Sequence, residues 1–258
     1  MTRLPALRRA WSARWLWLGL GGLQLALAAA LAAPLRVVAR AAMGPFTISG
    51  EDRLLAALIE LTTHNEAIVS ALIATLAATG VLALVLAPLL AGAVVSRLAG
   101  PCGVGEQARA AAVHFPAALV IGIYGLVLRA LLAFVAAALG TLHPALQLVA
   151  LVAALTFSAL AVDLARARVV LDGARGLHPR TFVRAVAAAA RPGLWLRSGL
   201  LTALHWGVSL GVLLAAVHGL GEGWSPWMVR GLALLATFVA LWRIAVAVEH
   251  VRATPPAA

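Results

Sequence analysis

Residues 67–96 read AIVSALIATLAATGVLALVLAPLLAGAVVS, a run of thirty residues without one charged side chain. A helix needs about 20 predominantly apolar residues to cross the hydrocarbon core of a bilayer, so this run is long enough to span a membrane. Its only proline is Pro88, and membrane helices tolerate proline because neighbouring groups satisfy the freed backbone carbonyl. The run therefore predicts a transmembrane helix and places the chain among membrane proteins.

The composition of the whole chain agrees with this assignment. Of its 258 residues 63% are hydrophobic and 11% are charged, and the mean hydropathy is +1.00. Soluble domains are about 25% charged, and disordered chains are poor in apolar residues, so both classes are excluded. Cys102 is the only cysteine, so no intrachain disulfide can form. All 20 basic residues are arginine, against 9 acidic residues, which gives a net charge of +11. The retention of positive charge on the cytoplasmic side of a membrane explains this excess without a nucleic-acid partner.

Other apolar runs extend the pattern to about six spans. Their approximate limits are 15–35, 67–95, 117–139, 145–164, 198–220 and 228–248. Between the third and fourth, residues 140–144 combine glycine and proline and predict a tight turn. The sixth is the shortest, because only residues 231–242 are uncharged, and it spans only if the flanking arginines reach opposite headgroups. We predict an all-α, polytopic transmembrane bundle that forms a single membrane domain over residues 1–258.

The arginines predict the orientation of this bundle. Six spans put both termini on one side, and that side carries fifteen arginines: Arg3, Arg8, Arg9, Arg14, Arg97, Arg109, Arg166, Arg168, Arg175, Arg180, Arg184, Arg191, Arg197, Arg243 and Arg252. The opposite side carries four: Arg36, Arg40, Arg53 and Arg230. Because cytoplasmic loops retain positive charge, we expect both termini in the cytoplasm of a bacterium, with the chain in the inner membrane.

Cytoplasmic amphipathic helices are expected beside the spans, most clearly over residues 177–193. At 100° per residue one side of that helix carries the basic residues Arg180, Arg184 and Arg191, and the other carries Phe182, Val183 and Val186. Such a helix fits the plane of the lipid headgroups. Three interpretations remain open for its arginines: contact with anionic lipid, docking of an acidic cytoplasmic or membrane protein partner, and an ordinary positive loop.

A longer string in this region resembles a known family. Asp163-Leu-Ala-Arg166-Ala-Arg168 runs on to Asp172 and Arg175, and Phe182-Val-Arg184-Ala and Arg191-Pro192 follow. This string is similar to a family of uncharacterised bacterial six-span integral membrane proteins. In that family a D-x-A-R sequence ends span four, and a basic amphipathic helix ending in proline leads into span five. The family's usual aromatic residue after the aspartate is Leu164 here. The resemblance covers about residues 160–195 and implies the topology, but no activity.

Four charged residues lie where span four leaves the membrane: Asp163, Arg166, Arg168 and Asp172. Asp163 and Arg166 are three residues apart, and Arg168 and Asp172 are four apart, so both pairs can close on one helix face. A carboxylate near hydrocarbon needs such a partner. The group predicts a neutralised helix end, with a hinge or coupling element as the functional alternative.

Arg129 lies near the middle of span three, where an ionisable residue is a functional hypothesis by default. We expect its side chain to point into the bundle against polar atoms. His205 of span five and freed backbone carbonyls are the candidate partners. Packing and function both remain open as its role.

No catalytic, metal or cofactor signature is found in the sequence. Glu60 and His64 stand four residues apart on an expected outer helix over residues 51–65, but a third ligand is lacking. The P-loop and the common hydrolase and metalloprotease motifs are missing. We therefore expect a non-enzymatic scaffold or accessory subunit. The alternative is a transporter or permease subunit coupled to a cytoplasmic partner through the Arg-rich loop 166–197, and the third class is a lipid-processing enzyme.

Overall fold

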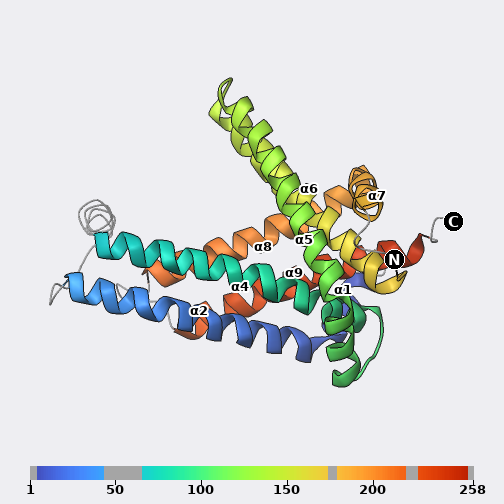
Figure 1. The fold of residues 1–258 in the computed structure, drawn as a ribbon, viewed down its shortest axis with the longest axis horizontal. Helices are drawn as coiled ribbons and strands as arrows, with labels where there is room; N and C mark the ends of the chain where they lie inside the picture. The colour runs from blue at the N-terminus through green and yellow to red at the C-terminus, as the bar shows by residue number, and fades with distance from the viewer. Residues whose placement is uncertain (1–4, 44–65, 174–178, 219–225, 255–258) are drawn as a thin grey trace. The chain divides into compact units, whose positions relative to one another are not determined.

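The computed structural model describes residues 5–43, 66–173, 179–218 and 226–254, which form helices and no strand. The helices, drawn in Figure 1, are α1 (Pro5–Ser12), α2 (Arg14–Met43), α4 (Glu66–Ala99), α5 (Val104–Gly140), α6 (Pro144–Leu171), α7 (Pro179–Ala189), α8 (Pro192–His218) and α9 (Pro226–Ala253). The all-α prediction is thus confirmed for the described residues. The expected outer helix over residues 51–65 lies outside them.

Within the described ranges, four helices are long and apolar enough to cross a membrane. These candidate spans are Val69–Ala99, Val104–Gly140, Pro144–Leu171 and Arg230–Ala253, so the short last span is among them. The predicted spans 15–35 and 198–220 fall on α2 and α8, and both reach residues whose side chains the structure does not describe. The described residues thus contain four candidate membrane spans, and six spans remain a prediction.

The helices α5 and α6 form an antiparallel hairpin (Figure 1). They are joined at Thr141–His143, within the turn predicted at residues 140–144. Pro144 occupies the first turn of α6, where its missing N–H costs nothing, and Nδ1 of His143 caps the helix by accepting from Ala145 N at 3.1 Å. Gly125 faces Val162 so closely that a Cβ there would overlap the Val162 side chain. The glycine therefore sets how near the two helices approach.

Prolines and a second close contact mark the junction of α4 and α5. Pro88 lies inside α4 and Pro116 inside α5, and each helix continues past its proline. Gly92 of α4 lies against the backbone of α5. A Cβ there would overlap the Ala110 carbonyl oxygen and lie 2.8 Å from its carbonyl carbon. Helix crossings of this kind, with a small residue at the contact, are typical of membrane bundles.

The chain divides into two compact units. Unit 1 contains Met1–Trp17, Leu84–Gly207 and Ala236–Ala258, and unit 2 contains Leu18–Ala83 and Val208–Leu235. Unit 1 has a close-packed core in which Leu98, Ile121, Leu160, Leu164, Val239 and Val248 are essentially fully buried. On the α5–α6 hairpin, by contrast, Phe134 is 78% exposed and Leu131 is 61% exposed. Large apolar patches of this kind face lipid or partners more readily than water.

Two short helices complete unit 1. In α1, Ala6 and Ala10 are buried, and Trp11 meets Phe238 of α9 edge-on with ring centroids 6.0 Å apart. In α7 the buried residues are Phe182, Ala185, Ala188 and Ala189. The ring of Phe182 lies 5.6 Å from that of Tyr124 of α5, and α7 packs on α6.

The packing of α7 corrects one expectation about its apolar face. Val183, placed on that face from the sequence, is 62% exposed. The stripe at residues 182, 185 and 189 instead packs on protein, which turns Val183 toward the side that carries Arg180 and Arg184. A periodicity argument cannot choose between two neighbouring stripes when both contain small or apolar residues.

Candidate functional site

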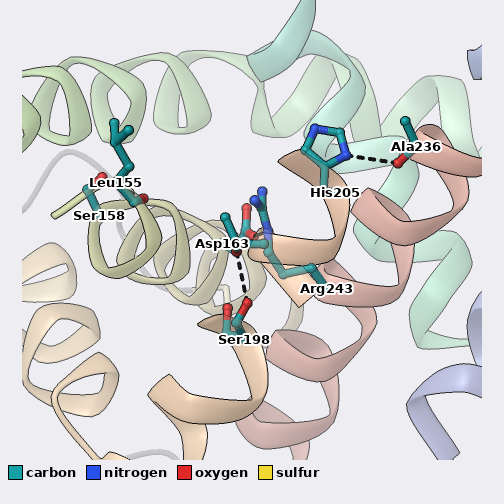
Figure 2. Close-up of polar contacts among 8 residues, drawn as sticks. Leu155, Ser158, Asp163, Ser198, His205, Ala236 and Arg243 are labelled. Carbon is teal, nitrogen blue, oxygen red and sulfur yellow. Dashed lines mark hydrogen bonds and ion pairs between the residues drawn. The ribbon is translucent and has the colours of Figure 1, made fainter. Parts of the chain in front are cut away.

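Asp163 and Arg243 form the central ion pair of unit 1 (Figure 2). Nε of Arg243 on α9 donates to Oδ2 of Asp163 on α6 at 2.8 Å, and the two side chains are 17% and 7% exposed. The sequence paired Asp163 with Arg166 on the same helix. The structure adds Arg243 of the last helix as an ion-pair partner of the carboxylate, while Arg166 remains an electrostatic neighbour of Asp163.

Arg129 is bonded to the neighbouring helix of its hairpin. Its Nε donates to Oγ of Ser158 on α6 at 3.2 Å, and Ser158 in turn donates to the Leu155 carbonyl at 3.1 Å. Ser158 is fully buried, whereas the Arg129 side chain remains exposed over much of its surface. The structure thus supplies a serine as the polar partner, and not His205 as the sequence suggested.

His205 lies on α8 and is bonded to α9. Its Nδ1 is 3.0 Å from the Ala236 carbonyl oxygen. Figure 2 draws this contact as a dashed line. Seven residues before His205 is Ser198, and seven residues after Ala236 is Arg243. Ser198 thus lies two helical turns from the His205 contact along α8, and Arg243 lies two turns from it along α9. The Oγ of Ser198 is buried and has no hydrogen-bond partner.

Arg166 lies beside the ion pair on α6. Its guanidinium is attracted by the carboxylate of Asp163 and repelled by the guanidinium groups of Arg129 and Arg243. A Cβ added at Gly122 of α5 would lie 3.5 Å from Nη2 of Arg166, so the guanidinium lies against this part of α5. Its Nε is buried and unpartnered. We call Arg129, Arg166 and Arg243 the inner cation cluster.

A second set of charges lies at the ends of α6, α8 and α9. Partial desolvation raises the pKa of the Asp172 carboxyl, and the Arg168 guanidinium four residues earlier opposes that shift. Arg168 and Arg191 also act electrostatically on His250 of α9, whose Nε2 is buried without a partner. Arg168 therefore interacts electrostatically with Asp172, as predicted, and also with His250, on which Arg191 acts as well.

The basic residues of the α7 region face away from the core. Arg180 and Arg184 are exposed on α7, and Arg191 is exposed just after it. The structure thus separates the predicted site residues into three places: the inner cation cluster with Asp163, the helix ends with Arg168 and Asp172, and the outward side of α7. His205 stands apart from all three, two turns along α8.

Two residues of the centre were missed as site residues from the sequence. Arg243 was assigned to the cytoplasmic side, although it interrupts an otherwise apolar run, which is the signal that a span carries a buried charge. Ser158 gave no signal, because serine is common in membrane helices. Among the described residues no three His, Cys, Asp or Glu side chains come together as metal ligands.

A groove between α6 and α8 also belongs to unit 1. It has a volume of about 480 Å³ and an apolar lining that includes Leu148, Val152, Trp195 and Leu200, with Thr156 as a polar member. Comparisons with protein-family models, with curated proteins and with solved structures found no match to this chain.

Proposed function

We propose that this chain is a multi-pass protein of the bacterial cytoplasmic membrane that acts as a non-enzymatic scaffold or accessory subunit. One observation carries the proposal: three polar side chains of unit 1 are each bonded to a neighbouring helix. Asp163 joins α6 to α9, Arg129 joins α5 to α6, and His205 joins α8 to α9. Polar groups used in this way fix the arrangement of a bundle.

A transport pathway makes a different demand on such residues. Charged groups along an ion or substrate path face a water-filled cavity, because the transported species must displace water from them. Here neither the groove between α6 and α8 nor the hollow formed by Leu7, Arg8, Trp11 and Phe238 is lined by Arg129 or Asp163. The bonded arrangement therefore favours a scaffold.

Thiol labelling tests this proposal at Ser158. In a Cys102→Ala background, Ser158→Cys is expected to resist a water-soluble maleimide in native membranes, because the residue is fully buried beside Arg129. Thr141→Cys, in the exposed turn between α5 and α6, is the matched control and should label readily. Rapid labelling of Ser158→Cys would show an aqueous path to the bundle centre and would favour the transport alternative.

The second candidate function is a transporter or permease subunit coupled to a cytoplasmic partner through residues 166–197. The observation that favours it is the orientation of α7. Its apolar residues are used against α5 and α6, which leaves Arg180, Arg184 and Val183 directed outward. An exposed basic helix with one apolar residue among the arginines fits an acidic partner surface. Anionic lipid remains the competing occupant of this side.

Reporter fusions test the proposed orientation. Fusions after Gly103 and after Asp172 are expected to report the cytoplasm, and a fusion after Thr141 is expected to report the periplasm. The reason is the excess of arginine on the side that carries both termini. A fusion after Arg252 should agree with the first two. If the Gly103 and Thr141 fusions report the same compartment, the α5 span does not cross and the topology is wrong.

A further inference from the structure

Arg129 is an exposed charge far from the end of its candidate span. It lies twelve residues before Thr141, in the exposed turn after α5, and that separation is about 18 Å of helix. Half the thickness of a hydrocarbon core is about 15 Å. In a span that ends at this turn, Arg129 lies near the middle of the bilayer, too deep for the side chain to extend to the headgroups.

Only part of the Arg129 guanidinium is used inside the hairpin. Nε donates to Oγ of Ser158 at 3.2 Å, and that hydroxyl is held by its own bond to the Leu155 carbonyl. No other hydrogen bond or ion pair joins Arg129 to the described part of the chain. The serine therefore orients the guanidinium, while Nη1 and Nη2 at the end of the planar group stay available to another acceptor.

The side of α5 that adjoins Arg129 is apolar and open. At 100° per residue, Leu126, Ala130, Ala133 and Ala137 lie within about 100° of Arg129, and all of them are exposed. Alanines allow the backbone of another helix to come close, as small residues do at helix contacts in membranes. We call these five residues the Arg129 face.

We propose that the Arg129 face binds a transmembrane helix of a partner protein that carries an aspartate or glutamate near its middle. This inference rests on the proposed role as an accessory subunit and gives the chemistry of the partner. A carboxylate accepts two parallel N–H···O bonds from a guanidinium, and Nη1 and Nη2 offer that geometry. The pair would neutralise a charge that hydrocarbon cannot solvate.

Two other occupants of the Arg129 face meet its charge less well. Lipid chains offer no acceptor to a guanidinium at the middle of the bilayer. A second copy placed by a twofold axis would bring two Arg129 side chains together, and like charges repel. In the described candidate spans the carboxylate farthest from a helix end is Asp163, which is 7% exposed and already bound to Arg243.

The test uses the full-length protein in vesicles of phosphatidylcholine. The probes are synthetic helices of about 20 leucine and alanine residues whose central residue is Glu, Gln or Leu. In a Cys102→Ala background, a donor dye on Thr141→Cys and an acceptor dye on the probe report association by energy transfer. The Glu probe is expected to associate about tenfold more tightly than the Leu probe, with the Gln probe between them.

Variants assign this preference to Arg129. Arg129→Leu is expected to bind the three probes equally, and it should still fold because Ser158 keeps its bond to the Leu155 carbonyl. Arg129→Glu should prefer a probe with a central Lys to the Glu probe. Arg109→Leu removes the same charge from an exposed position of α5 outside the predicted span and should keep the tenfold preference of the wild type.

Three results would overturn the proposal. Equal binding of the Glu and Leu probes to the wild type leaves the Arg129 face to lipid, and this result does not depend on how any variant folds. Equal losses in Arg129→Leu and Arg109→Leu assign the preference to general charge. Energy transfer between two labelled copies of the wild type that Arg129→Leu abolishes assigns the face to a second copy.

These results leave the scaffold role to its own test. If the Glu probe shows no preference while Ser158→Cys resists the maleimide, the partner helix is excluded and the scaffold role stands. If Ser158→Cys labels rapidly, the scaffold role fails whatever the probes show.

Discussion

Replacing Asp163 by leucine is expected to destabilise the protein by about 3–5 kcal/mol, the largest effect we predict for one side chain. The carboxylate is 7% exposed and holds Nε of Arg243 at 2.8 Å between α6 and α9. Its loss leaves the largely buried Arg243 without its ion-pair partner and removes the carboxylate that acts on Arg166. The measurement is the free energy of unfolding of the full-length protein in detergent.

The double variant Asp163→Leu/Arg243→Leu is the decisive companion. Replacing a buried ion pair by apolar residues is often neutral or stabilising, so the double variant should recover most of the loss. Asp172→Leu, at the exposed end of the same helix, should change stability by no more than about 0.5 kcal/mol. A single variant as stable as the wild type, or a double variant that loses as much as the single one, would contradict the cross-link between α6 and α9.

Gly92→Ala is expected to cost about 1–3 kcal/mol through overpacking, although alanine is the better helix former. The added Cβ would overlap the carbonyl oxygen of Ala110 and lie 3.0 Å from the Ala111 Cα. Backbone atoms cannot move aside as a flexible side chain can. The two helices must therefore separate, and the neighbouring buried residues Val95 and Leu98 lose contacts. Unfolding of the purified variant measures the cost.

Gly80→Ala is the matched control on the same helix. Nothing lies within 4 Å of a Cβ at Gly80, so only helix propensity acts, and the variant should gain up to about 1 kcal/mol. The two substitutions are chemically identical and have opposite expected signs. If both stabilise the protein, α4 and α5 are not in backbone contact at Gly92.

The sequence predicts the parts of this fold that depend on local pattern. The hairpin of α5 and α6 follows from two apolar runs and the glycine and proline between them, and the short α7 follows from its helical period. These features depend on hydrophobic length and on residues that break helices, both of which act within a few residues. The all-α class can be predicted without knowing which helices are in contact.

The centre of unit 1 depends instead on contacts between distant helices. From the sequence Asp163 had an arginine three residues away, and local closure was the simplest solution. The structure pairs it with Arg243, eighty residues later, because the Asp163 side of α6 faces α9. Arg129 likewise finds a serine that no pattern marks. The spacing of two charged residues along a helix shows whether they can pair within that helix. It does not show which residue of another helix packs against them.

The eighty residues between Asp163 and Arg243 also determine how long after Asp163 its ion-pair partner is synthesised. Ribosomes add about 5–20 residues per second, so roughly 4–16 seconds separate the synthesis of the two partners. During that interval α6 has left the ribosome with an acidic side chain and no α9 to receive it. In that interval the charge nearest to Asp163 along its own helix is Arg166. A chain cut short before α9 lacks Arg243 permanently, so Asp163 never gains the ion pair that joins α6 to the last helix.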